Sequence, residues 1–201
     1  MLSREQRWQV IKNNCLIREG PHNIVFSVGS IDSRVMIVGE APGAEEVIKN
    51  EPFVGDAGKI LTDGLESVGI SRTDLYITNA VKRRPTKISD KGNIVNTTPN
   101  QKMIDWFNIY LRQEIELINP DLIVILGATS YKAVHNVSTI KVSDIRGKFI
   151  TASIGDKDYK TFCMLHPASL IYSDKNIYAF SQDLDTLQRY ILKNKLQDKK
   201  E

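Results

Sequence analysis

The chain has 201 residues, of which 27 are Lys or Arg and 24 are Asp or Glu, and 41% of its residues are hydrophobic. This length suits one domain, which we expect to span residues 1–201 and to bury a sizeable core. The longest strongly apolar run, residues 122–126, is far shorter than the about 20 residues that a membrane span needs, and the first residues contain no apolar signal-peptide core. We therefore expect a cytoplasmic protein that does not bind membranes.

Short apolar runs alternate along the chain with helical patterns. The helical patterns cover residues at about 3–14, 57–68, 101–118, 129–135 and about 177–196. Buried strands are predicted over residues 35–38, 75–78, 122–126 and 162–165. This alternation predicts an α/β fold, a three-layer α/β/α sandwich with a central, mainly parallel four-stranded sheet. Residues 148–160 predict a hairpin that leads into the last strand, and the polar residues 86–98 predict a mobile loop.

Polar and glycine-rich residues follow each predicted strand. Gly39-Glu40-Ala41-Pro42-Gly43 follows the first strand, Asn79 the second, Gly127 the third and His166-Pro167 the fourth. In sheets of this kind, ligands bind in the crevice beyond the carboxyl ends of the strands. We therefore expect these residues to share one site.

Several segments between about residues 34 and 175 together resemble family 4 uracil-DNA glycosylases. Residues 39–43, followed by Glu51-Pro52-Phe53-Val54-Gly55-Asp56-Ala57-Gly58, are similar to the first motif of that family. Residues 78–85 are similar to its second motif, and residues 166–170 to its closing His-Pro motif. The resemblance implies a uracil-DNA glycosylase-like fold and a monofunctional hydrolase of base excision repair. Such an enzyme flips uracil out of single- or double-stranded DNA and hydrolyses its N-glycosidic bond, leaving an abasic site.

The resemblance also implies roles for individual residues. Glu40 and His166 would be catalytic: His166 would donate a hydrogen bond to uracil O2, and Glu40 would support the sugar cation or activate water. The uracil-binding residues would be Gly39, Ala41, Phe53 and Asn79, with Phe53 stacking on the base and Asn79 bonding its Watson–Crick edge. Without the resemblance, Phe53 could be a core aromatic, Asn79 a strand-end cap and His166 a structural histidine.

A basic segment follows the second predicted strand. Lys82-Arg83-Arg84-Pro85-Thr86-Lys87 carries four cations in six residues, and another four lie between residues 193 and 200. The resemblance places Lys82, Arg83 and Arg84 on DNA phosphates, with Ser169 also touching DNA and Leu170 wedged into the base stack. The alternatives are a solvated basic loop and, for Leu170, a loop that covers the core. We interpret the second cluster as a solvated helix end, and Glu45 and Glu46 as solvent-facing loop charges.

The cysteines depart from the family pattern, which carries four for an iron–sulfur cluster. Cys15 stands at the second of these positions, but Lys12 stands at the first, Arg83 at the third, and residues 99–118 contain none. One thiolate cannot hold such a cluster, so we expect no cofactor, no metal and two reduced thiols, Cys15 and Cys163. Side chains would fill the vacated volume, with three candidates: Trp8, Trp106 and Phe107.

Other functions stay open at this stage. The same fold could excise another damaged or modified base, or the chain could be a non-catalytic DNA-binding homologue. A covalent trap by a loop histidine is disfavoured, because residues 82–100 contain no His. A generic nucleotide-binding protein is least favoured, since residues 39–43 match neither a dinucleotide fingerprint nor a Walker loop. The expected partner is uracil-containing DNA, bound by a monomer.

Overall fold

A five-stranded sheet forms the centre of the protein, whose computed structural model describes residues 2–197 without the side chain of Tyr172. The strand order is β2-β1-β5-β7-β6. The bounds are Val35–Gly39 for β1, Tyr76–Asn79 for β2, Leu122–Leu126 for β5, Phe149–Ile154 for β6 and Lys157–Met164 for β7. Only β6 runs antiparallel to its neighbour among these strands. The predicted four-strand count is therefore one too low, because the first arm of the predicted hairpin joins the sheet as β6.

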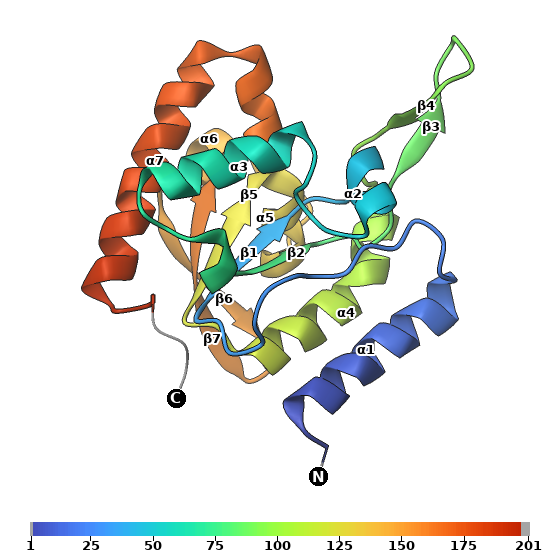
Figure 1. Cartoon of the computed structure of the whole chain (residues 1–201), viewed down its shortest axis with the longest axis horizontal. Helices are drawn as coiled ribbons and strands as arrows, with labels where there is room; N and C mark the ends of the chain where they lie inside the picture. The colour runs from blue at the N-terminus through green and yellow to red at the C-terminus, as the bar shows by residue number, and fades with distance from the viewer. Residues whose placement is uncertain (1, 198–201) are drawn as a thin grey trace.

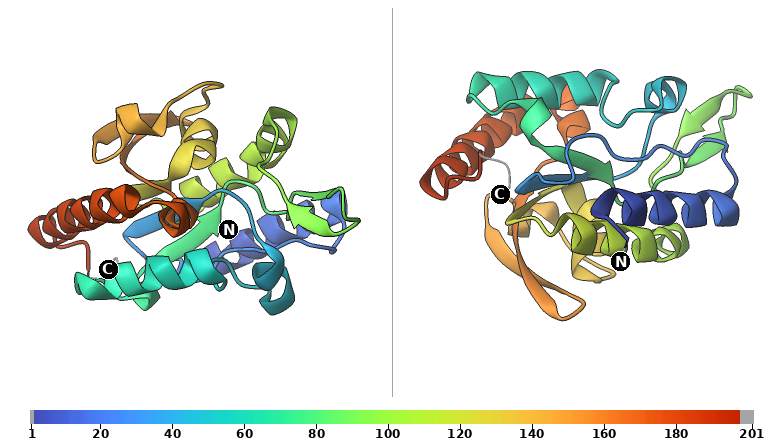
Figure 2. Two further views of the ribbon diagram at one scale, coloured as in Figure 1. Left: turned by 90° about the horizontal axis from the view of Figure 1, so that it is seen from above. Right: turned by 60° about the horizontal axis from the view of Figure 1, so that its bottom comes forward.

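Helices cover both faces of this sheet (Figures 1 and 2). Their bounds are Arg4–Glu19 for α1, Ala44–Lys49 for α2, Asp56–Ser67 for α3, Gln101–Ile118 for α4, Gly127–His135 for α5, Val142–Ile145 for α6 and Asp174–Lys193 for α7. Two short 3₁₀ helices, η1 and η2, span Arg72–Asp74 and Pro167–Tyr172. The predicted three-layer, mainly parallel sandwich is confirmed. The end of the predicted basic tail, residues 198–200, lies outside the described part of the chain.

Alternate side chains of each central strand enter two different cores. In β5, Ile123 and Ile125 pack with residues of α1, α4 and α5. Leu122, Val124 and Leu126 pack with residues of α3 and α7 on the opposite face. A period of two is what strand geometry imposes when both faces of a sheet are covered. None of the helices within residues 2–197 combines the length and the apolar character that a membrane span requires.

The segment predicted to be a mobile loop is a second, smaller sheet. β3 (Thr86–Ile88) and β4 (Ile94–Asn96) pair antiparallel, with Thr86 opposite Asn96 and Ile88 opposite Ile94. The hairpin projects from the body of the protein beside α2 (Figure 1). The loop prediction is wrong because β-branched residues on both sides of a turn favour strands even in a polar stretch. Gly92 supplies the turn with a positive φ of 78°.

Candidate active site

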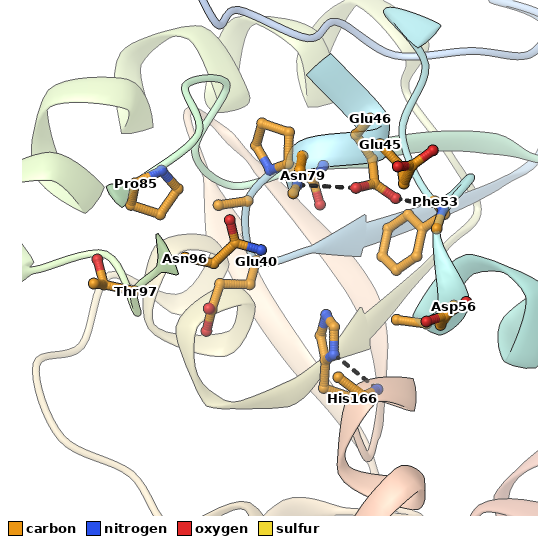
Figure 3. A pocket seen from close by; sticks show the side chains of 17 residues that line it. Glu40, Glu45, Glu46, Phe53, Asp56, Asn79, Pro85, Asn96, Thr97 and His166 are labelled. Atoms are coloured by element: carbon orange, nitrogen blue, oxygen red, sulfur yellow. Dashed lines mark hydrogen bonds between the residues drawn. The ribbon is translucent and has the colours of Figure 1, made fainter. Parts of the chain in front are cut away.

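The carboxyl ends of β1, β2, β5 and β7 meet at one edge of the sheet, beside a cavity of about 360 Å³. Five residues singled out in the sequence line it: Glu40, Ala41, Phe53, Asn79 and His166. They come from four separate segments of the chain and are arranged around the same space (Figure 3). The hairpin contributes a further wall, through Pro85, Asn96 and Thr97.

Glu40 follows β1 directly and is held by α5. The Thr129 hydroxyl donates a hydrogen bond to Glu40 Oε2 at 2.5 Å, which fixes the orientation of the carboxylate. Burial raises the pKa of Glu40, and the bond from Thr129 opposes that rise because it stabilises the charged form. An oriented, partly desolvated carboxylate can stabilise a nearby cation or accept a proton from water.

His166 caps the first turn of η2 and is held in one tautomer. Its Nδ1 accepts a hydrogen bond from the backbone N–H of Ala168 at 3.3 Å. Burial lowers the pKa of His166 to about 4, so the ring is neutral at neutral pH. Because Nδ1 is the acceptor, the ring proton lies on Nε2. The residue therefore offers one N–H donor without carrying a charge.

Phe53 lies between the carboxyl end of β1 and His166, in a backbone conformation that non-glycine residues seldom adopt. Its φ is +56°, and its ring centroid is 6.0 Å from that of His166, with the planes tilted by 31°. Two glycines leave room for it. A Cβ on Gly39 would lie 2.3 Å from Phe53 Cζ, and one on Gly58 would lie 2.0 Å from the Phe53 carbonyl. The position of the ring thus depends on the absence of two side chains.

Asn79 ends β2 with its side chain buried at the cavity wall. Its backbone carbonyl accepts a hydrogen bond from Lys82 Nζ at 2.8 Å, which anchors the main chain. Within residues 2–197, its carboxamide has no hydrogen-bond partner in the protein. One acceptor and two donor hydrogens are therefore available for a ligand's polar edge.

Glu46 ties the two loops of the first motif together (Figure 3). Its Oε2 accepts from the N–H of Gly43 at 3.0 Å, while Oε1 accepts from the N–H groups of Val54 at 3.0 Å and Gly55 at 2.8 Å. The prediction that Glu46 is a solvent-facing loop charge is wrong. The same prediction agrees with the exposed side chain of Glu45, whose Oε2 lies 4.0 Å from Lys49 Nζ.

Comparisons with known proteins identify the family of this chain. The sequence model described as "Uracil DNA glycosylase superfamily" matches residues 26–188. This chain belongs to the uracil-DNA glycosylase superfamily. It is 35% identical to the type-4 uracil-DNA glycosylase of Thermotoga maritima over 182 residues, which are 88% of this chain and 89% of that one. The type-4 enzyme of Archaeoglobus fulgidus is 35% identical over 161 residues, 79% of this chain and 77% of its own.

One basic residue of the second superfamily motif lies inside the protein. The prediction that Lys82 contacts DNA is wrong, because its side chain is 1% exposed and its ammonium pairs with Glu114 of α4. Arg83 pairs with Glu19 at 3.0 Å. Arg84 Nε donates to Asn96 Oδ1 at 2.7 Å, at the base of the hairpin. DNA contact by Arg83 and Arg84 stays a prediction.

The turn after His166 also differs from the expectation that the glycosylase resemblance raised. Leu170 is buried in the core shared with α3 and α7, so the structure contradicts an exposed wedge at that position. The Ser169 hydroxyl donates to the His166 carbonyl at 2.8 Å and stabilises the turn. Ile171, in the same turn, has an exposed apolar side chain.

The residues around Cys15 do not fit the iron–sulfur cluster of family 4 glycosylases. Both cysteines are free and buried, and Cys163 lies on β7. Burial raises the pKa of the Cys15 thiol to about 11, which disfavours the thiolate that iron requires. Among the described residues, no group of three or more His, Cys, Asp or Glu is placed to hold a metal ion. Of the predicted filling residues, Phe107 shares the core of Cys15, whereas Trp106 is exposed beneath the Arg18 guanidinium.

The sequence analysis missed the structural roles of three residues. Glu46 carries a detectable signal, because it stands three positions after the N-cap Gly43, as in a capping box. Glu114 also carries one, since it interrupts the apolar face of a predicted helix. Thr129 has no comparable signal, because its role depends on the approach of α5 to the end of β1.

Proposed function

We propose that this protein excises uracil from DNA by hydrolysing the N-glycosidic bond. The observation that supports this most strongly is the convergence of Glu40, Phe53, Asn79 and His166 on one cavity. An aromatic face, an uncommitted carboxamide, a neutral N–H donor and a carboxylate suit an everted pyrimidine and its sugar. DNA binding alone would not require the neutral N–H donor and the carboxylate.

Recognition of the base would come from Phe53 and Asn79. The Phe53 ring offers a stacking face, and the Asn79 carboxamide can pair with a carbonyl and the ring N–H of uracil together. Gly39 ends β1 and Ala41 lines the cavity two residues later, so this segment would bring the backbone close to the base. The flipped nucleotide leaves its stack at a cost of a few kcal/mol, which these contacts offset.

Bond cleavage would follow from the charges that develop. As the C1′–N1 bond breaks, its electron pair moves onto the base and the sugar becomes cationic. The Nε2–H of His166 donates to O2 as that oxygen gains negative charge, and the carboxylate of Glu40 stabilises the sugar cation. Water then adds to C1′ and loses a proton to Glu40, which returns it to solvent. The released uracil anion is protonated by solvent.

We propose further that the enzyme works without a cofactor, as a cytoplasmic monomer. Four thiolate ligands cannot come from two cysteines on separate elements. Two buried, unpaired thiols suit a reducing compartment. Iron analysis of the purified protein tests the first point: stoichiometric iron with broad visible absorbance would overturn it.

The function is tested with a labelled oligonucleotide that contains one uracil. We expect purified protein, in the presence of EDTA, to produce an abasic site that alkali cleaves, and to leave a matched thymine oligonucleotide intact. Excision of hypoxanthine, xanthine or a 5-substituted pyrimidine without uracil excision would favour a different lesion. DNA binding without product from any of these bases would favour a non-catalytic homologue.

A further inference from the structure

The β3–β4 hairpin presents an apolar pair that no other part of the described protein covers. Ile88 is 75% exposed and Ile94 is 66% exposed, and the two residues face each other across the strands. Two adjacent exposed side chains of this size on a projecting element form an apolar patch, which is a candidate binding surface. The hairpin projects from the body of the protein in Figure 1 and in the right-hand view of Figure 2.

The face that carries this pair continues the wall of the active site. Because side chains alternate along strands, Ile88 and Ile94 share a face with the next pair inward, Thr86 and Asn96. Asn96 lines the cavity, and its Nδ2 lies 3.3 Å from where a Cβ on Gly43 would be. The cavity wall therefore extends outward along one face of the hairpin to the isoleucines.

The spacing along this face matches the spacing of nucleotides. Two residues of strand separate the Ile88–Ile94 pair from the Thr86–Asn96 pair, which is roughly 7 Å. Nucleotides of one strand rise by about 3.4 Å each, so the separation corresponds to about two nucleotides. A strand whose uracil occupies the cavity must run over its rim, where the hairpin begins.

The charges on the hairpin favour a nucleic acid over a protein partner. Lys87 and Lys91 are exposed, and Asp90 is the one acidic residue between positions 86 and 96. Arg84 adds a cation at the base, where it bonds Asn96. Apolar side chains flanked by cations suit a base stack with phosphates on its edge.

We propose that the β3–β4 hairpin is a DNA-binding arm, an inference that rests on the proposed function. Ile88 and Ile94 pack against the bases and sugars about two nucleotides from the everted uracil. Lys91, in the turn next to this face, contacts the phosphates beside them, whereas Lys87 lies on the opposite face of the strand. The arm holds the strand at a fixed distance from the cavity and takes no part in bond cleavage.

The test compares the double variant Ile88→Ser with Ile94→Ser against wild type, on uracil oligonucleotides trimmed one nucleotide at a time from either end. We expect the double variant to raise KM about tenfold on the full substrate, with kcat unchanged. On substrates that lack the nucleotides about two positions from uracil on one side, the two proteins should have equal KM values. Two controls accompany it: Ile17→Ser, which changes an isoleucine that is 84% exposed on α1, and the conservative pair Ile88→Val with Ile94→Val.

An unchanged KM in the serine variant on the full substrate would overturn the proposal, as would an equal rise in the Ile17→Ser control. A tenfold rise that persists on the trimmed substrates would also overturn it, because the arm would then not contact those nucleotides. If wild type excises no uracil, the proposed function fails. The proposal that the hairpin binds DNA is then tested by fluorescence anisotropy on the same oligonucleotide. Equal Kd values for wild type and the serine variant would refute that proposal.

Discussion

The ammonium group of Lys82 and the carboxylate of Glu114 form an ion pair behind the active-site cavity, with side chains that are 1% and 0% exposed. The same ammonium donates to the Thr78 hydroxyl at 2.5 Å and to the Asn79 carbonyl at 2.8 Å. Tyr76 donates to the other oxygen of Glu114 at 2.8 Å. This network joins α4 to the end of β2, and so determines where Asn79 stands.

Removal of one partner of this pair should destabilise the protein strongly. We expect Glu114→Gln to lower the free energy of unfolding by about 3–5 kcal/mol, because it leaves the Lys82 ammonium buried without a counter-charge. Urea denaturation measures this value. The double variant Lys82→Met with Glu114→Leu should lose less unfolding free energy than Glu114→Gln alone. The half-exposed pair of Arg34 and Asp121 is the control, and Asp121→Asn should cost about 1 kcal/mol or less. Equal losses for the two single variants would contradict the prediction.

The catalytic and DNA-contact roles should separate in steady-state kinetics. We expect Asn79→Ala and His166→Ala each to lower kcat by about 10²- to 10³-fold, since each removes a donor to the departing base. Arg84→Ala should instead raise KM and reduce the salt dependence of binding by about one unit of slope. Lys160→Ala, at an exposed position of β7, is the control and should change neither. The reverse assignment of kcat and KM effects would show that the roles are exchanged.

The layered fold and the position of the site could be predicted from local patterns. The apolar run 122–126, bounded by Asn119-Pro120-Asp121 and Gly127, has the composition of a strand covered on both faces. The carboxyl ends of parallel strands then meet at one edge, which is why Glu40, Asn79 and His166 could be grouped without coordinates.

The side-chain environments could not be predicted in the same way. Lys82 belongs to a basic run, and its burial depends on Glu114, which is 32 residues further along the chain. Leu170 follows a surface turn in the sequence, yet the approach of α3 and α7 buries it. Both cases depend on long-range packing, which a local pattern does not contain.

The hydrogen bonds that Glu46 accepts from the two loops should contribute more to stability than the charge of Glu45. We expect Glu46→Gln to cost about 1–3 kcal/mol of unfolding free energy, because a carboxamide cannot accept all three backbone N–H groups without turning its own N–H₂ toward one of them. Uracil excision should also fall, since Phe53 precedes the tethered residues. Glu45→Gln is the matched control and should stay within about 0.5 kcal/mol of wild type. The idea fails if both variants unfold at the same denaturant concentration.

Crowding at Gly39 should lower the activity strongly. In Gly39→Ala, the new methyl group would lie 2.3 Å from Phe53 Cζ and 2.4 Å from Asn79 Oδ1, so both uracil-binding side chains must move. Displacement by about 1 Å at a reacting site can cost 10²-fold in rate, and we expect a loss of that order in kcat/KM. Gly69→Ala is the contrast: its φ of +73° strains the backbone by about 1 kcal/mol, but nothing lies within 4 Å. Its kcat/KM should therefore equal that of wild type.

Acidification should destabilise the fold through His166. The pKa of His166 is lowered to about 4 in the folded protein from an ordinary 6.5, because burial disfavours the charged ring. Between these values the unfolded chain binds the proton more readily, so this contribution to stability is complete above pH 6.5 and decreases as the pH falls toward 4. The loss is at most about 3 kcal/mol. It is measured as the difference in unfolding free energy between the wild type and His166→Ala at each pH.

Glu40 changes the stability with pH in the opposite direction, so its contribution must be separated from that of His166. Burial raises the pKa of Glu40, so the folded protein binds its proton more readily and gains stability on acidification. The comparison is therefore made in a Glu40→Gln background, where the remaining difference belongs to His166. That difference should decrease steadily between pH 6.5 and about 4. A difference that stays constant over this range would mean that His166 is as easily protonated in the folded protein as in the unfolded chain, and the lowered pKa would then be wrong.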